Sequence, residues 1–150
     1  MKIKCIAIGN RIMGDDSIGI KVLEALSSEL EKEKIEVIFG ETDIDYALRK
    51  IDDRDLLFII DSTYFNIAPG TVTFTSIEKA IKGQQQIYSQ HQPNLINLLK
   101  TYNKSVRGYI VGIEVEKIHF SVDLSETLRK KFLSICEEIY EIIYQTIRGI

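Results

Sequence analysis

The sequence has 150 residues and a formal net charge of −3 at pH 7, with 45% hydrophobic and 27% charged residues. This balance is typical of a soluble globular protein, and the length predicts one domain over residues 1–150. The composition gives no basic footprint for nucleic acid, and no apolar run approaches the ~20 residues of a membrane-spanning helix.

The N-terminus and the two cysteines favour a cytoplasmic protein. The apolar stretch from Cys5 to Ile8 is shorter than the hydrophobic region of a signal peptide, and no small-residue cleavage site follows it. Cys5 and Cys136 form no Cys-X-X-Cys pair, so we expect both to be reduced residues of the core.

The first half of the chain predicts three strands and two helices. In chain order they are a strand at 3–8, a helix from about 18 to 34, a strand at 35–39, a short helix around 46–51 and a strand at 56–60. Apolar residues recur every four positions from Ile18 to Leu30, which is the spacing of an amphipathic helix. The unbroken apolar run from Leu56 to Ile60 indicates a strand that is covered on both faces.

The second half of the chain adds two strands and two helices. In chain order we expect an edge strand at 71–75, a polar loop at 82–92, a helix opened by Pro93, a strand at 106–115 and a final helix. The segment from Asp123 to Glu126 resembles a capping box, in which Asp123 caps the final helix.

Strands that alternate with helices predict an α/β protein. The expected architecture is three-layer α/β/α, with a twisted, mainly parallel five-stranded sheet. In such sheets, sites form outside the carboxyl ends of the strands. The loop from Gly9 to Asp16 and the residue Asp61 both lie at predicted carboxyl ends, so we expect them to share one crevice.

The first loop disfavours nucleotide binding. Gly9 and Gly14 partly imitate a phosphate-binding loop, but the next residues are Asp15 and Asp16 instead of Lys and Ser or Thr. A simpler interpretation is that an aspartate caps the following helix, although only one residue can occupy the cap. We assign the capping role to Asp15, together with orientation of the loop, and Asp16 is then available for a cation.

Asp61 and one of the two histidines extend this candidate site. Asp61 ends the most apolar strand, where it either bonds to turn amides or faces the crevice. His91 lies in a loop just before a helix, whereas His119 follows a strand and is expected to have no catalytic role. Two carboxylates and one imidazole suit a first-row divalent metal such as nickel or zinc. The HExxH motif of zinc peptidases and the GxSxG motif of serine hydrolases are absent.

Four motifs follow one another along the chain. They are Gly9-Asn10 through Gly14-Asp15-Asp16 to Gly19, Ile60-Asp61 with Pro69-Gly70-Thr71, Ser89-Gln90-His91, and Val111-Gly112-Ile113-Glu114 leading to Leu124-Ser125. In this order the motifs resemble those of the hydrogenase maturation protease family over nearly the whole chain. The resemblance implies an endopeptidase that removes the C-terminal extension of a nickel-loaded hydrogenase large-subunit precursor. The substrate would supply the nickel, and the enzyme would hold no metal or other cofactor of its own.

The resemblance also assigns residues to the site. Asp16, Asp61 and His91 would be the catalytic residues and would contact the nickel. We add Asn10 and Thr42 as residues that hydrogen-bond the substrate chain. The expected partner is a nickel-iron hydrogenase large-subunit precursor, with neither nucleic acid nor membrane involved.

Two residues depart from the pattern of the family. Ser17 stands where a glycine is usual, and in Gly40-Glu41-Thr42 the glutamate replaces a common second glycine. Both departures leave the expected ligands in place, while the substrate, the cleavage site and the oligomeric state stay open. The alternative functions are a non-catalytic nickel-binding module and a paralogous protease that acts on another protein.

Overall fold

The computed structural model describes residues 2–82, 92–101 and 106–150. Within these ranges the strands are β1 (Ile3–Ile8), β2 (Ile35–Glu41), β3 (Leu56–Thr63), β4 (Val72–Ser76) and β5 (Arg107–Glu114). The helices are a 3-10 helix η1 (Gly14–Ser17), α1 (Ile18–Lys32), α2 (Ile44–Arg49), α3 (Ile77–Ile81), α4 (Gln92–Thr101) and α5 (Glu126–Arg148). All predicted strands are present, and the short helix α3 is one that the sequence pattern did not indicate. None of the helices described is both long and apolar enough to span a bilayer.

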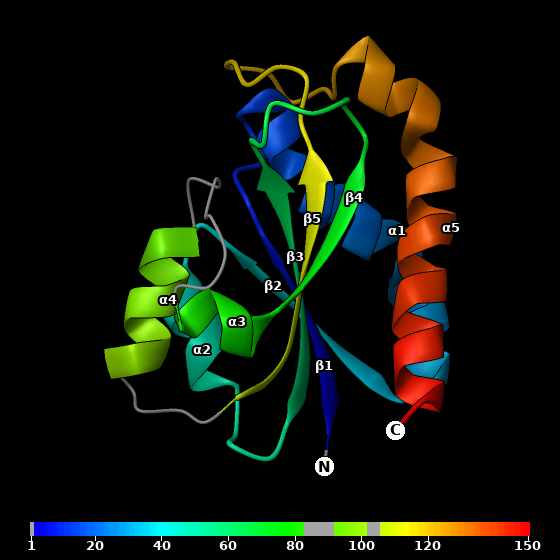
Figure 1. Cartoon of the computed structure of the whole chain (residues 1–150). Helices are drawn as coiled ribbons and strands as arrows, with labels where there is room; N and C mark the ends of the chain where they lie inside the picture. Colours follow the sequence, from blue (N-terminus) through cyan, green and yellow to red (C-terminus); the bar gives the residue numbers. More distant parts are fainter. Residues whose placement is uncertain (1, 83–91, 102–105) are drawn as a thin grey trace.

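The strands form one sheet in the order β2-β1-β3-β5-β4 (Figure 1). Only β4 is antiparallel to its neighbour, and it lies at the edge. This confirms the predicted mainly parallel, five-stranded sheet. From β1 the chain passes to β2 on one side and then to β3 on the other, so the strand order reverses between β1 and β3. Such a reversal opens a crevice at the carboxyl ends of the two strands.

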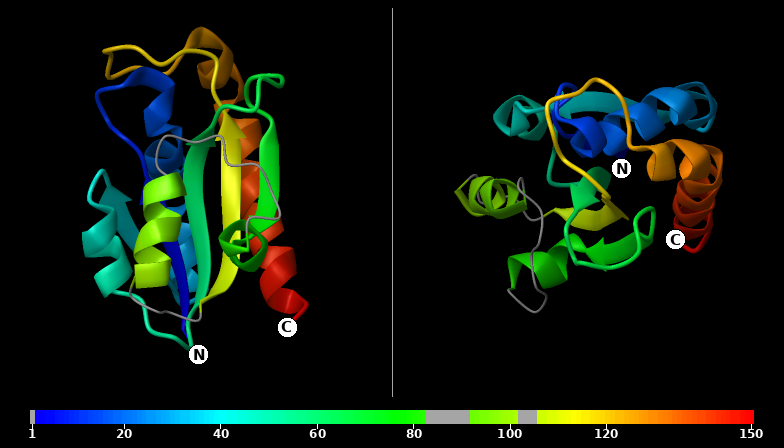
Figure 2. Two further views of the ribbon diagram at one scale, coloured as in Figure 1. Left: turned by 60° about the vertical axis from the view of Figure 1, so that its left-hand side comes forward. Right: turned by 90° about the horizontal axis from the view of Figure 1, so that it is seen from above.

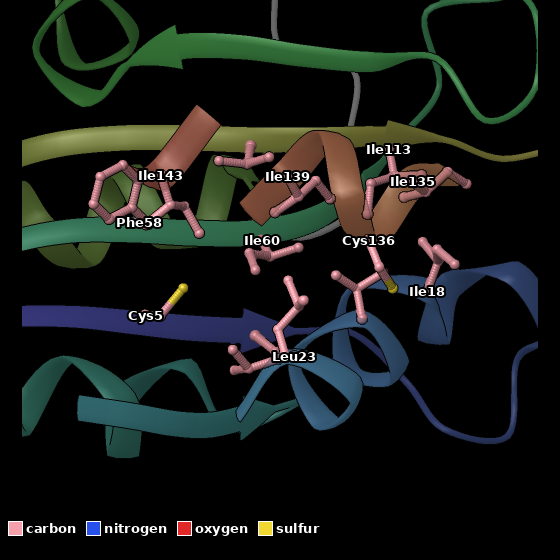
Figure 3. Close-up of a cluster of buried hydrophobic side chains, with 14 of the residues drawn as sticks. Cys5, Ile18, Leu23, Phe58, Ile60, Ile113, Ile135, Cys136, Ile139 and Ile143 are labelled. Atoms are coloured by element: carbon pink, nitrogen blue, oxygen red, sulfur yellow. The ribbon is translucent and has the colours of Figure 1, made fainter. Parts of the chain in front are cut away.

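Helices cover both faces of the sheet, as the α/β/α prediction required (Figure 2). α1 and α5 pack on one face, and α2, α3 and α4 pack on the other. Along β3, Phe58 and Ile60 belong to the α1/α5 core, whereas Leu57 and Ile59 belong to the opposite core. Successive side chains of a strand point to opposite faces, which explains why this strand is apolar at every position. Figure 3 shows Phe58 and Ile60 in one cluster with Ile139 and Ile143 of α5.

Both cysteines are unpaired residues of the α1/α5 core (Figure 3). Burial raises the pKa of the Cys5 thiol to about 12. Burial, together with the nearby charge of Glu137, raises the pKa of Cys136 to about 11. Because the thiolate is the nucleophilic form, both side chains are unreactive at neutral pH. The prediction of reduced core cysteines is confirmed.

β3 is longer than the sequence indicated. It continues to Thr63, so Asp61 lies inside the strand and not after it. The reason is that residues 61–63 pair with residues 112–114 of β5. Strand pairing is made by backbone groups, so the polar side chains of residues 61–63 did not indicate that the strand continues.

The start of the final helix also differs from the prediction. The cap is Ser125, whose Oγ accepts a hydrogen bond from the backbone N–H of Leu128 at 3.3 Å. Asp123 is instead held in a turn by a bond from its own N–H to Oγ of Ser121 at 3.0 Å. Of the predicted polar loop at 82–92, residues 83–91 lie outside the described residues.

A buried ion pair joins the beginnings of β1 and β3. Nζ of Lys4 lies 2.7 Å from Oδ2 of Asp55, and both side chains are buried. Burial by itself would raise the pKa of Asp55, but the hydrogen bond and the charge of Lys4 outweigh burial, so the pKa is lowered from 3.8. The pair therefore stabilises the fold above pH 3.8, and this stabilisation is lost as the pH falls through the lowered pKa.

We expect Asp55→Asn to reduce the free energy of unfolding by about 3 kcal/mol at pH 7, because Lys4 stays buried without its carboxylate. The difference from the wild type should shrink below pH 3.8, where Asp55 of the wild type begins to protonate. Urea unfolding curves recorded from neutral to acidic pH measure this difference, with the exposed Asp53→Asn as the matched control. A difference that stays constant into strong acid would contradict the role of the pair.

Candidate active site

The carboxyl ends of β1, β2, β3 and β5 lie along one edge of the sheet, because these strands are parallel. The pairing of β1 with β3 ends at Ala7 and Ile60. β3 continues beyond this point, paired only with β5, through residues 61–63. The loop that follows β1 therefore has access to the unpaired side of this extension.

Asp16 lies at this point, in the short helix η1 before α1. Its side chain is buried and held from two directions. Oδ2 accepts the backbone N–H of Asn10 at 2.9 Å, and Oδ1 accepts the hydroxyl of Ser62 at 2.7 Å. These bonds tie the carboxylate to the beginning of its own loop and to the extension of β3, so its orientation is set before any ligand arrives.

Asp61 is the neighbour of the serine that holds Asp16. Its side chain is buried, and Oδ1 accepts the backbone N–H of Ser62 at 2.8 Å. The alternation along β3 directs Ser62 toward the α1 face, as for Ile60, and Asp61 toward the face covered by α4. Bonding to a local amide, one of the two interpretations of Asp61, is therefore confirmed, and a role of Asp61 at the crevice stays a prediction. The role of Ser62 was not predicted, although its position two residues after Ile60 indicates the face that it occupies.

Two glycines allow close backbone contacts around the first loop. Gly9 has φ of 154°, and a Cβ at this position would lie 2.3 Å from the carbonyl oxygen of Asp16. A Cβ at Gly19 would lie 2.7 Å from the carbonyl oxygen of Ile60. A side chain at Gly9 would push η1 away from the end of β1, and a side chain at Gly19 would push α1 away from β3. Both glycines therefore serve close backbone approach.

Asp15 does not cap α1, and that prediction was wrong. The cap residue of α1 is Ser17, which makes no side-chain capping bond. The buried Asp15 carboxylate instead accepts the backbone N–H groups of Glu116 and Lys117, both at 3.0 Å, and of Ser125 at 2.7 Å. Asp15 lies in η1, between the first loop and α1, and its bonds reach the segment after β5. Asp15 therefore does orient the loop, because it joins the loop to that segment.

Glu114, the last residue of β5, is a second buried carboxylate that holds a loop, and the sequence did not reveal this role. Its buried Oε1 accepts the hydroxyl of Thr63 and the N–H of Phe65, both at 2.9 Å. Its Oε2 accepts the N–H groups of Asn66 at 3.0 Å and Ile67 at 3.3 Å. One carboxylate therefore shapes the chain that leaves β3.

The two residues expected to bind the substrate chain lie at the same edge. The side-chain oxygen of Asn10 accepts the N–H of Ile12 at 3.1 Å, so it shapes the loop. Thr42 is exposed and directly follows β2. His119, for which no role was expected, lies against the first loop, because a Cβ at Gly14 would be 3.2 Å from its Nδ1.

The third expected ligand, His91, lies outside the described residues and directly precedes α4. In the part of the chain that the structure describes, no three His, Cys, Asp or Glu side chains are arranged to hold a metal ion. The structure therefore supplies the surroundings of Asp16 and Asp61, and the metal-reading triad stays a prediction.

The family model described as HycI, hydrogenase maturation protease, matches residues 20–142. The chain belongs to the hydrogenase maturation protease family. As a member of this family it is a peptidase whose partner is a hydrogenase. No curated protein matches the chain in sequence.

Several solved structures share the fold of this protease. The hydrogenase maturating endopeptidase HybD from E. coli is 23% identical, with a TM-score of 0.78 over 97% of this chain and 94% of that one. The NiFe hydrogenase maturation protease HybD from Thermococcus kodakarensis is also 23% identical, with a TM-score of 0.77 over 95% and 99%. A hydrogenase 2 maturation peptidase from a Thaumarchaeota archaeon is 16% identical, with a TM-score of 0.66 over 98% of both chains.

The two departures of this protease from the family pattern are both accommodated locally. Glu41 has φ of 53°, in the left-handed region that favours glycine. Its carboxylate accepts Nε of Arg11 at 2.6 Å, and Arg11 also pairs with Glu24 of α1 at 3.0 Å. The charge of Glu41 is therefore matched by a neighbouring cation. The hydroxyl of Ser17 donates to the carbonyl of Gly14 at 2.8 Å, inside η1.

Tyr64 lies just beyond the extension of β3 that carries Asp61 and Ser62, and the sequence did not suggest a role for it. It follows β3 and is partly exposed. Partial burial raises the pKa of its phenol above 10.0, and so do the negative charges of Asp16, Asp15 and Glu114. The phenol is therefore protonated at neutral pH.

Proposed function

We propose that this protease removes the C-terminal extension from a nickel-loaded hydrogenase large-subunit precursor. Asp16, Asp61 and His91 contact the nickel that the precursor carries. The observation that carries the proposal is the buried Asp16 carboxylate, bonded to the residue next to Asp61 at the point where the strand order reverses. Two buried acids there favour a cation, and the nickel of the substrate is one.

The chemistry follows from what a bound cation does to its neighbours. Nickel placed near the scissile peptide bond would polarise the carbonyl or lower the pKa of a bound water. One of the two aspartates would then act as the general base that takes the proton of the attacking water. Ser62 orients Asp16 for either role through its 2.7 Å bond, and Asn10 does so through its backbone N–H.

The glycine contacts suit this role for a protein substrate. η1 lies directly against Gly9 at the end of β1, and α1 lies directly on β3 at Gly19, so close backbone contacts hold the segment that carries Asp16. Catalytic groups are most effective when they are held close to the productive geometry before the substrate binds. The position of Asp16 is therefore set by the fold itself.

The proposal is tested by the intact mass of a hydrogenase large-subunit precursor from the source organism, after incubation with the protease. We expect loss of a C-terminal peptide from the nickel-loaded precursor and an unchanged mass for the nickel-free precursor. Cleavage of both forms would mean that the protein is a protease that does not recognise nickel. If every loaded precursor keeps its mass while the isolated protein binds free nickel tightly, the non-catalytic nickel-binding module is correct.

A further inference from the structure

Two segments beside Asp16 are joined into one braced unit. The loop after β1 and residues 115–125 after β5 lie side by side at the carboxyl edge of the sheet (Figures 1 and 2). The N–H of Ser121 donates to the carbonyl of Ile12 at 2.9 Å, and the N–H of Gly14 donates to the carbonyl of Ser121 at 2.8 Å. The three bonds to Asp15 reinforce this ladder. The backbone of the unit is thus fixed by the fold.

The braced unit displays three exposed apolar side chains, here called the apolar rim. They are Ile12, Phe120 and Val122, with exposed fractions of 45%, 79% and 64%. An isolated bridge between Met13 and Ser121 places Ile12 and Phe120 at matching positions, each one residue earlier. Because the backbone is braced, these side chains cannot turn inward by a simple loop movement. Exposed apolar groups gathered beside a site mark a surface that binds a partner.

A side chain of α1 also holds the backbone of the rim at Val122. Nζ of Lys21, on α1, donates to this carbonyl at 2.8 Å. The rim is therefore attached to the same helix that follows Asp16, and its position relative to the carboxylate is set by the fold. A preorganised apolar surface loses little entropy when it binds, which favours an interaction role.

The position of the rim indicates what covers it. Ile12 precedes Asp16 by four residues, so their Cα atoms are at most about 14 Å apart. A specific protein interface covers about 800 Å² on each partner, which corresponds to a radius of roughly 16 Å. A protein substrate centred on Asp16 therefore reaches the rim, and its contact with the rim is continuous with its contact at the crevice.

Resting on the proposed function, we propose that the apolar rim binds an apolar surface of the hydrogenase precursor and contributes to substrate selection. Aromatic residues are frequent among those that dominate protein interfaces, and Phe120 is the most exposed member of the rim. Arg11, the cation nearest in sequence, is already paired with Glu24 and Glu41, so it does not give the rim an unmatched charge. Apolar contact is thus the chemistry that the rim offers.

The experiment uses the full-length protease carrying both Phe120→Ser and Val122→Ser, with Leu133→Ser as the matched control. Leu133 is 76% exposed and lies on α5, outside the rim. Dissociation constants are measured for the nickel-free precursor, which the proposed function leaves uncut, and KM and kcat for the loaded one. We expect about a tenfold or larger rise in Kd and KM for the double variant, with kcat and the melting temperature unchanged.

The outcomes separate the rim from the proposed function. Equal Kd and KM for the wild type and the double variant, with cleavage intact, would overturn the rim and leave the function standing. Binding through the rim without cleavage of any loaded precursor would overturn the function and support the rim. Equal losses in the Leu133 control would also overturn the rim. A wild-type dimer that the double variant dissolves, seen by light scattering, would assign the rim to a second copy of this chain.

Discussion

Asp16→Asn is expected to slow removal of the C-terminal extension by about 10²- to 10⁴-fold, because it removes the negative charge that we propose to contact the nickel or to take the proton. The fold should be retained, since the amide oxygen of asparagine can still accept one of the bonds now made by the N–H of Asn10 and the hydroxyl of Ser62. Asp61→Asn and His91→Ala are expected to have effects of similar size. Intact-mass time courses with the loaded precursor measure each rate.

The matched control for these variants is Asp53→Asn, an exposed aspartate in the turn before β3. It changes the net charge by the same amount as Asp16→Asn, but far from the carboxyl edge of the sheet. Its cleavage rate should equal that of the wild type. Wild-type cleavage by Asp16→Asn or Asp61→Asn would remove that residue from the mechanism, and a large loss of melting temperature would assign it a structural role instead.

Glu114→Ala is expected to lower the free energy of unfolding by about 3 kcal/mol or more. The substitution leaves a hydroxyl and three backbone N–H groups without the acceptor that they share, and unsatisfied buried donors are costly. For a domain of this size the corresponding loss of melting temperature is roughly 6–12 °C. Thermal unfolding followed by circular dichroism measures it.

Two further variants serve as comparisons for Glu114→Ala. Glu114→Gln keeps one acceptor oxygen but directs an amide NH₂ at the other donors, so its loss should be intermediate. Glu116→Ala, two residues away and exposed, should leave the melting temperature unchanged. If Glu114→Ala melts within 2 °C of the wild type, water replaces the carboxylate and the segment after β3 does not depend on it.

Asp15 and Glu114 explain how loops keep their shape around the crevice. Each is a buried carboxylate that accepts hydrogen bonds mainly from backbone amides of a segment distant in sequence. Hydrogen bonds to charged groups are stronger than neutral ones. Asp15 thus fixes the segment that follows β5, and Glu114 fixes the segment that follows β3.

Much of the fold could be predicted from local pattern. The strands and the long helices followed from apolar periodicity, because a buried strand and an amphipathic helix leave different spacings in the sequence. The elements that were missed or misplaced are the ones without such spacing. α3 has five residues, η1 has four, and the end of β3 is polar. Their structure depends on partners elsewhere in the chain.

The sequence by itself determined the class of the fold, the edge of the sheet at which Asp16 and Asp61 lie, and the resemblance to a protease family. These conclusions follow from the alternation of strands and helices along the chain and from the motifs, and both can be read from the sequence. Only the tertiary structure decided the roles of Asp15, Ser62 and Glu114. Their hydrogen-bond partners lie between 46 and 110 residues away for Ser62 and Asp15, and no periodicity encodes contacts across such separations.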